Sequence, residues 1–173
     1  VVLDDDPTGT QTVHDLPVLT EWSAVALREE LARGTACFYV LTNSRSFPEP
    51  EARRLAQTIG ANLLAASQAA GRPVAVVSRS DSTLRGHFPV EVEALAEALT
   101  TPFDGWLLVP AFIEGGRYTI DNTHYAAEGD NLVPTGETPY ARDAAFGYRA
   151  SDLTAWVAEK TGGRVAARDV ASI

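Results

Sequence analysis

Four short polar segments carry most of the residue types in this chain that bind ligands or do chemistry. Each follows an apolar run, and successive segments are spaced by about 35 to 40 positions, which suits one strand-plus-helix unit each. The carboxyl ends of parallel strands meet at one edge of an open α/β sheet, and ligands bind at that edge. We therefore expect the four segments to converge on one site. They are residues 4–10, 42–46, 78–87 and 110–117.

Arginine is prominent in these segments, although the net charge of the chain is −9. Arg45, Arg79, Arg85 and Arg117 all lie within them. A planar guanidinium group pairs bidentately with carboxylate or phosphate. The segments therefore predict an anionic ligand.

Carboxylates accompany the arginines in the first and third segments, at Asp4, Asp5, Asp6 and Asp81. A carboxylate at such a place can accept a hydroxyl proton, bind Mg²⁺ or hydrogen-bond sugar hydroxyls. Nearby serine, threonine and asparagine side chains add the short donors and acceptors that a polyol needs. The plainer alternative is that the aspartates and arginines only pair with one another and cap helices.

Alternating strands and helices would position these segments. Apolar, β-branched runs predict strands, and recurrences at three and four positions predict amphipathic helices. This alternation predicts an α/β fold, a mostly parallel sheet with helices on both faces (Rossmann-like), with an irregular loop or hairpin insertion around 113–147. The strands are expected at 1–4, 36–42, 73–78 and 105–109, and the helices at 23–33, 49–70, 89–99 and 151–160.

Composition excludes several classes of protein. The chain has 173 residues, of which 45% are hydrophobic, which is ordinary for a globular domain. Its acidity disfavours non-specific binding to nucleic acid or to anionic membranes. The sequence has no apolar stretch long enough to span a membrane. The single Cys37, within an apolar run, is expected to be a buried core thiol, and the three histidines show no zinc-site spacing.

Two phosphate-binding motifs are missing from the sequence. It contains no G-x-x-x-x-G-K-[ST], and no G-x-G-x-x-G follows the first expected strand. Any ATP used by this protein is therefore expected to bind mainly outside this segment. The chain also starts inside an apparent strand and has no initiator methionine, so we expect it to be a fragment.

The polar segments resemble the four-carbon acid sugar kinase family. The resemblance lies in five ordered motifs, of which 81–86 is the most specific, and it covers at least residues 1–143. The motifs are 5–9 (DDPTG), 42–46 (TNSRS), 81–86 (DSTLRG), 110–119 (PAFIEGGRYT) and 138–143 (TPYARD).

The resemblance implies a substrate-binding role for this chain. Residues 1–173 would be the N-terminal sugar-acid-binding domain, and the C-terminal nucleotide-binding domain would lie outside this chain. The whole enzyme would phosphorylate a hydroxyl of threonate, erythronate or 3-oxo-tetronate with ATP and Mg²⁺ in the cytoplasm. The expected partner is a small anionic sugar acid, with no nucleic acid and no membrane, and a homodimer stays open.

Roles for individual residues follow from the segments and the resemblance together. Asp5 and Asp81 are the candidate catalytic residues, and the sequence does not decide which one is the base. No residue is assigned as a metal ligand. The candidate substrate-binding residues are Asp6, Thr8, Gly9, Asn43, Arg45, Ser82, Arg85, Gly116 and Arg117.

Two other functions remain open from the sequence. Residues 4–8 also read as D-x-D-x-T, so a haloacid-dehalogenase-like phosphatase would use Asp4 as nucleophile and Asp6 as general acid. Such an enzyme also needs a lysine near the phosphate, and the only lysine is Lys160 in an expected helix. The second alternative is a non-catalytic module that binds a sugar acid.

Overall fold

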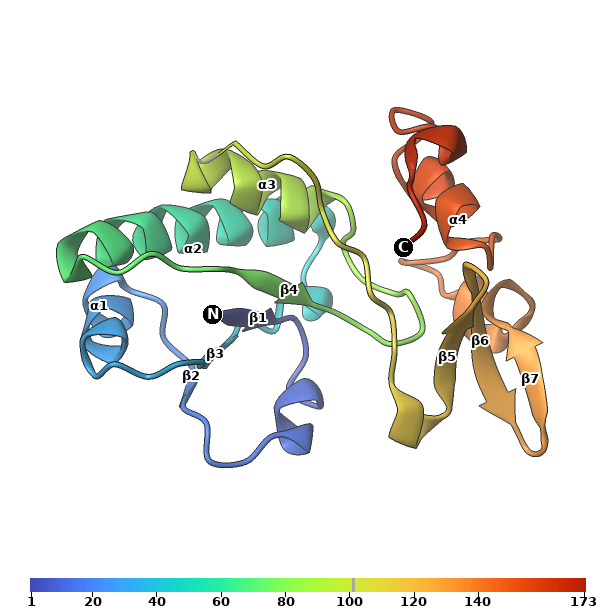
Figure 1. Ribbon diagram of the computed structural model, residues 1–173, viewed down its shortest axis with the longest axis horizontal. Helices are drawn as coiled ribbons and strands as arrows, with labels where there is room; N and C mark the ends of the chain where they lie inside the picture. The colour runs from blue at the N-terminus through green and yellow to red at the C-terminus, as the bar shows by residue number, and fades with distance from the viewer. Residues whose placement is uncertain (101) are drawn as a thin grey trace. The chain divides into compact units, whose positions relative to one another are not determined.

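A parallel sheet covered by three helices forms the first part of the structure (Figure 1). The computed structural model describes residues 1–100 and 102–173, which make two compact units. The first unit comprises Val1–Ser80 and Val90–Gly105. The second unit comprises Asp81–Pro89 and Trp106–Ile173.

The sheet of the first unit has the strand order β2-β3-β1-β4, and all its pairings are parallel. Leu3 lies beside Val40, and Asp4 lies beside both Leu41 and Arg79. The carboxyl ends of β1, β3 and β4 are therefore level, as predicted. The strands are β1 (Val2–Asp4), β2 (Val18–Leu19), β3 (Tyr39–Leu41) and β4 (Val77–Arg79).

Helices α1 (Ala24–Ala32), α2 (Glu49–Ala70) and α3 (Val90–Leu99) match the predicted helices closely. The hydroxyl of Ser23 accepts a hydrogen bond from the backbone N–H of Ala26 and so caps α1. Gly71 ends α2 at φ +63°, a left-handed conformation that glycine adopts without strain. These local signals explain why the helix boundaries could be predicted.

The three helices share one core with the sheet instead of dividing between its two faces, which corrects the prediction of helices on both faces. Helix α2 packs against both α1 and α3. The crossovers β2–α1–β3 and β3–α2–β4 both advance toward β4, and right-handed crossovers in one direction place their helices on one face. The shared core contains Leu3, Leu27, Leu31, Phe38, Val40, Ile59, Leu63, Ala66, Leu95 and Leu99.

The second unit contains an antiparallel three-stranded sheet and one helix, which confirms a hairpin insertion in the region 113–147. Trp156, Val157 and Tyr148 form part of its core with Leu84 and Ala141. Its elements are β5 (Arg117–Ile120), β6 (Thr123–Glu128), β7 (Asn131–Pro134) and α4 (Leu153–Lys160). Short 3₁₀ turns complete the two units at Gly9–Thr12, Ser44–Ser46, Ile113–Gly115, Thr135–Glu137, Pro139–Arg142 and Ala167–Asp169.

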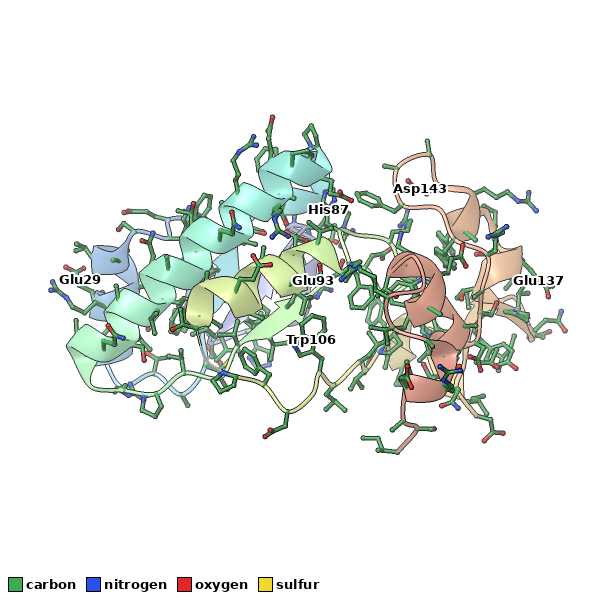
Figure 2. All side chains as sticks on the ribbon, turned by 90° about the horizontal axis from the view of Figure 1, so that it is seen from above. Glu29, His87, Glu93, Trp106, Glu137 and Asp143 are labelled. Atoms are coloured by element: carbon green, nitrogen blue, oxygen red, sulfur yellow. The ribbon has the colours of Figure 1, made fainter. Side chains whose placement is uncertain are left out.

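The strand predicted at 105–109 does not form. In this stretch the side chains of Leu107 and Val109 are 73% and 69% exposed, and Trp106, labelled in Figure 2, is half exposed. A strand needs a neighbour that satisfies its backbone hydrogen bonds, and an apolar run does not show by itself whether one is available. Among the described residues, no helix is long and apolar enough to cross a membrane.

Candidate functional site

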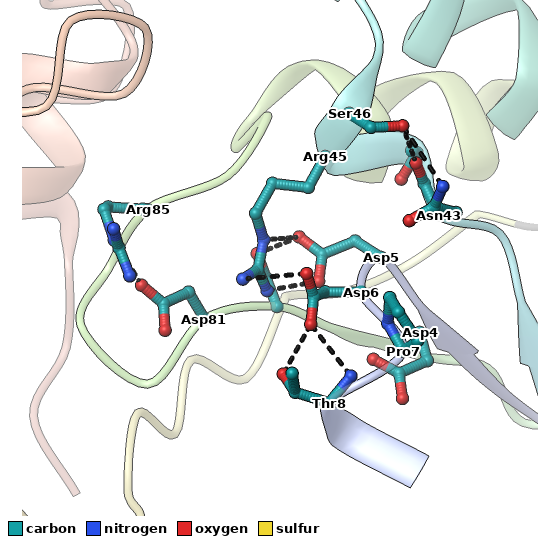
Figure 3. Close-up of polar contacts among 12 residues, drawn as sticks. Asp4, Asp5, Asp6, Pro7, Thr8, Asn43, Arg45, Ser46, Asp81 and Arg85 are labelled. Carbon is teal, nitrogen blue, oxygen red and sulfur yellow. Dashed lines mark hydrogen bonds and ion pairs between the residues drawn. The ribbon is translucent and has the colours of Figure 1, made fainter.

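An ion pair with two hydrogen bonds joins the segments that follow β1 and β3 in the first unit. The guanidinium of Arg45 donates from Nε to Asp5 Oδ2 at 3.0 Å and from Nη2 to Oδ1 at 2.6 Å (Figure 3). The two side chains are only 18% and 5% exposed. The hydroxyl of Ser80 donates to the same carboxylate at 2.7 Å. Parallel pairing of β1 and β3 thus builds a planar, bidentate ion pair at the predicted sheet edge.

Asp6 folds back on the following turn. Its Oδ1 accepts a hydrogen bond from the backbone N–H of Thr8 at 2.9 Å and another from the Thr8 hydroxyl (Figure 3). Burial alone would raise the pKa of Asp6, but the hydrogen bonds from Thr8 and the charge of Arg45 hold the pKa below its usual range. Asp6 is therefore an ionised acceptor at neutral pH.

Asp4 is fully buried and is held by Arg79 from the neighbouring strand β4. The Nη1 of Arg79 lies 2.9 Å from Asp4 Oδ1, whereas Asp4 Oδ2 has no hydrogen-bond partner among the described residues. Burial raises the pKa of Asp4, and the contact with Arg79 opposes that shift. Gly9 closes over the pair, because a Cβ at this position would stand 1.7 Å from Arg79 Nη1. Glycine at this position thus allows the loop to approach.

The segment after β3 supplies hydroxyl and amide groups. The Asn43 side chain is exposed, and its amide nitrogen lies 3.2 Å from the Ser46 hydroxyl. Asn43 also takes a left-handed backbone conformation, with φ +53°. The buried hydroxyls of Thr42 and Ser44, on either side of it in sequence, lie 3.1 Å apart. We refer to Asp4, Asp5, Asp6, Thr8, Arg45 and Arg79 as the strand-end cluster.

Glu91, in the first turn of α3, is a member of this region that sequence reasoning missed. It lines a small pocket together with Asp5, Ser44 and Arg79. Burial raises the pKa of Glu91 to about 7, and the Asp5 charge adds to that effect. An acid in a first helical turn looks like an ordinary solvated helix-terminal residue in sequence, so no signal marked it.

Arg85 is the centre of the polar contacts in the second unit. Its Nε donates to Asp81 Oδ2 at 2.6 Å, and its Nη1 lies 3.6 Å from Asp143 Oδ2. Its guanidinium also lies over the ring of Tyr140, 5.2 Å from the centroid. Backbone N–H groups of the following turn and the charge of Arg85 hold the pKa of Asp143 below its usual range.

Arg117 lies on the same aromatic ring but has a different set of partners. Its guanidinium is 5.3 Å from the Tyr140 centroid, with Nη2 at 3.1 Å from the Tyr140 hydroxyl and Nη1 donating to the carbonyl of Gly115. Its Nε is buried without a hydrogen-bond partner among the described residues. Within the same residues, no carboxylate forms an ion pair with Arg117. We refer to Asp81, Arg85, Arg117, Tyr140 and Asp143 as the arginine cluster.

Two buried side chains hold the loop that carries Asp81 and Arg85. The Tyr148 hydroxyl donates to the Thr83 carbonyl at 2.6 Å, and His124 Nε2 lies 2.7 Å from the Ser82 carbonyl. Burial lowers the pKa of His124, and a neutral ring with its proton on Nε2 donates to that carbonyl. Both residues belong to the second unit, and no sequence pattern reveals them.

The structure separates the predicted site residues into two groups. The fourth segment does not follow a parallel strand, since Arg117 begins β5, and the prediction that all four segments end parallel strands is wrong there. Gly116 has φ +71° and lies close to Ala127, so a glycine at this position allows the backbone conformation and the close approach. The first unit holds Asp5, Asp6, Thr8, Gly9, Asn43 and Arg45. The second unit holds Asp81, Ser82, Arg85, Gly116 and Arg117.

Neither group is a ready-made metal site. Within residues 1–100 and 102–173, no three His, Cys, Asp or Glu side chains are grouped so that they could hold a metal ion. The aspartates point instead to arginines and to hydroxyl or backbone donors. This arrangement favours hydrogen bonding to a ligand over metal coordination.

Comparisons with known proteins show which proteins this chain is similar to. A family model described as a sugar-binding N-terminal domain matches residues 1–173. Among solved structures, the chain is similar to a domain of unknown function (DUF1537) from Bordetella bronchiseptica, crystallised with bound citrate as a domain-swapped dimer. The identity is 24% and the TM-score is 0.62, over 90% of this chain and 38% of that chain. No curated protein matches.

Proposed function

Because the chain belongs to the family of sugar-binding N-terminal domains, we propose that it binds a small sugar acid as the substrate-binding part of an ATP-dependent kinase. The family assignment bears out the resemblance found in the sequence motifs, and the α/β fold agrees with it. The sugar acid would be of the four-carbon type, such as threonate, erythronate or 3-oxo-tetronate. The kinase would work in the cytoplasm.

The surroundings of Arg117 are the observation that supports an anionic ligand. Arg45, Arg79 and Arg85 each form an ion pair with an aspartate, whereas Arg117 has none among the described residues. A half-buried cation without a countercharge is costly, and a ligand carboxylate would remove that cost. The citrate in the neighbouring structure is also a small hydroxy acid, which supports a ligand of this class.

An arginine that is paired with an aspartate is suited to bind ligand hydroxyl groups. In the Asp5–Arg45 pair, the carboxylate supplies acceptors and the guanidinium supplies donors in one plane. A sugar hydroxyl both donates and accepts, so it can bridge such a pair where a plain anion would be repelled by the carboxylate. Asp6, Thr8 and Asn43 offer further polar groups in the same unit.

The proposed phosphoryl transfer would also need a part of the protein that lies outside this chain. The chain spans 38% of the length of the neighbour that it matches. ATP and Mg²⁺ would be held mainly by that further part. A carboxylate of this chain would accept the proton of the attacking hydroxyl while ADP leaves, and Asp5 and Asp81 are both candidates for that role. Kinase assays of Asp5→Asn and Asp81→Asn in the whole protein would identify the base.

Isothermal titration calorimetry with stereoisomers of threonate and erythronate tests the binding proposal. We expect Arg117→Ala to weaken binding about ten- to a hundredfold, since a charge-assisted hydrogen bond contributes about 1.5–3 kcal/mol. Arg168→Ala is the matched control, because the Arg168 side chain is 88% exposed, and it should bind as wild type does. Binding by Arg117→Ala at wild-type affinity would contradict the role of Arg117. Absence of binding by any tetronic acid at millimolar concentration would overturn the proposal itself.

Self-association is a second part of the proposal. The neighbouring structure is a domain-swapped dimer, and the exposed apolar stretch 106–109 of this chain is a surface that a second copy would cover. Light scattering after gel filtration should show a dimer in the wild type. Leu107→Asp should shift it toward monomer, and a wild-type monomer at high concentration would refute the dimer.

The phosphatase alternative fits the structure poorly. A nucleophilic aspartate must reach its substrate, but Asp4 is fully buried beneath Gly9 and paired with Arg79. Asp6, the matching general acid, is ionised by its contacts with Thr8. We therefore expect no hydrolysis of an aryl phosphate by this chain.

A further inference from the structure

Glu91 lies in an unusual place for an acidic side chain. It belongs to the first turn of α3 and lines the pocket next to the Asp5–Arg45 pair. The wall of that pocket supplied by α2 is apolar and consists of Leu55, Ala56 and Ile59. A carboxylate facing such a wall loses much of its hydration, which disfavours the charged form.

Three charged groups face Glu91 from the surrounding elements. Asp5 at the end of β1 disfavours a second negative charge, while Arg45 after β3 favours it. Arg79 on β4 lines the same pocket and is engaged with Asp4. The hydroxyl of Ser44 is the hydrogen-bonding neighbour that also favours the charged form. Burial outweighs these favourable contacts, and the pKa of Glu91 is raised to about 7.

We propose that Glu91 is a further determinant of ligand binding, and that a sugar acid binds the strand-end cluster at full affinity only when the Glu91 carboxyl group is protonated. This inference rests on the function proposed above. An ionised Glu91 would place a second carboxylate beside Asp5, close to the one guanidinium of Arg45. The negatively charged ligand would then meet extra repulsion, and a ligand hydroxyl would compete with two acids for the same cation. A protonated Glu91 removes that charge and adds a hydroxyl donor for a ligand oxygen.

The size of the effect follows from the fraction of molecules in the competent form. If only the protonated form binds, the apparent affinity scales with the protonated fraction of Glu91. For a group that titrates near pH 7, that fraction falls about tenfold between pH 6 and pH 8. Binding at pH 7 should also take up about half a proton from the buffer, because the ligand completes the protonation of Glu91.

Calorimetric titration of the full chain with the tetronic acid that binds it best tests this inference. We expect wild type to lose about tenfold in affinity from pH 6 to pH 8, and the heat to depend on the ionisation enthalpy of the buffer. Glu91→Gln should show neither effect. Glu97→Gln is the matched control on the same helix, since the Glu97 side chain is 56% exposed and pairs with Arg53, and it should behave as wild type.

A second variant keeps the test decisive if Glu91→Gln does not fold. Ser44→Ala removes the hydroxyl that favours ionised Glu91, so the loss of affinity should move to higher pH. Equal wild-type affinity at pH 6 and pH 8, with no proton uptake, would overturn the role of Glu91 and leave sugar-acid binding intact. No binding at either pH would overturn the proposed function, and this inference with it.

Discussion

Replacement of Arg85 by lysine tests the arginine cluster most directly, because it keeps the charge and removes the planar fork. In the wild type, Arg85 contacts Asp81 and Asp143 at once and lies on the Tyr140 ring. A lysine ammonium group is compact and lies on a flexible stem, so it can pair with one of these carboxylates but not with both. The change therefore removes one ion-pair contact and most of the ring contact.

The structure gives the size of this loss. A hydrogen bond to a charged group contributes about 1.5–3 kcal/mol, but the Arg85 side chain is 30% exposed and solvent screening reduces that figure to about 1 kcal/mol. The lost ring contact adds about 0.5 kcal/mol. Unfolding free energy should therefore fall by about 1–2 kcal/mol, which lowers the Tm by roughly 2–8 °C in a chain of this size.

Urea denaturation and calorimetric titration with a tetronic acid measure the two consequences. Arg149→Lys is the control, because Arg149 is 92% exposed in its contact with Glu159 and the change should alter neither stability nor binding. We expect Arg85→Lys to weaken sugar-acid binding by about tenfold in addition to the loss of stability. Wild-type values for both quantities would refute the proposed contacts of Arg85. Loss of stability with unchanged affinity would make Arg85 a structural residue only.

Three other changes test separate parts of the structure. Tyr148→Phe removes the hydroxyl that holds the Thr83 carbonyl and should cost about 1–2 kcal/mol in urea denaturation. Gly9→Ala should lower the Tm, because the added methyl group overlaps the buried pair beneath it, whereas Gly105→Ala meets nothing within 4 Å and should be neutral. Because the pKa of Glu91 is raised in the folded state, the folded state binds a proton more tightly than the unfolded chain does. The stability that this proton contributes is fully present below about pH 4.5 and is lost as pH rises through about 7. A urea series from pH 5 to pH 8 should show a fall of up to about 3 kcal/mol that Glu91→Gln abolishes.

Local chemistry explains which parts of the fold were predictable. The helix over residues 49–70 was predicted at its observed bounds from apolar residues that recur at three and four positions, and the structure shows Gly71 in a left-handed conformation at its end. The strands β1, β3 and β4 were predicted from their apolar runs, although each is shorter than expected and β4 ends one residue later than predicted. Each of these sequence patterns lies within the helix or strand that it predicts, or directly beside it.

Non-local features of the structure escaped prediction. An apolar run such as 105–109 becomes a strand only if another strand pairs with it, and that information is not in the run itself. The side of the sheet on which α1 lies depends on the position of β2, a strand of two residues that no pattern reveals. The environment of Glu91 is likewise formed by Asp5, Ser44 and the apolar wall of α2, which lie far from it in sequence.

The pairing of arginines with aspartates bears on ligand selectivity. In a chain of net charge −9, unpaired arginines would draw in any small anion, including inorganic phosphate. Three of the four arginines in the polar segments are instead compensated by Asp4, Asp5 or Asp81, which lowers their attraction for a simple anion. Such a pair still offers donors and acceptors in fixed geometry, and a ligand hydroxyl group, which both donates and accepts, can satisfy both. The hydroxyl groups of a polyhydroxy acid, the ligand proposed above, would meet this requirement.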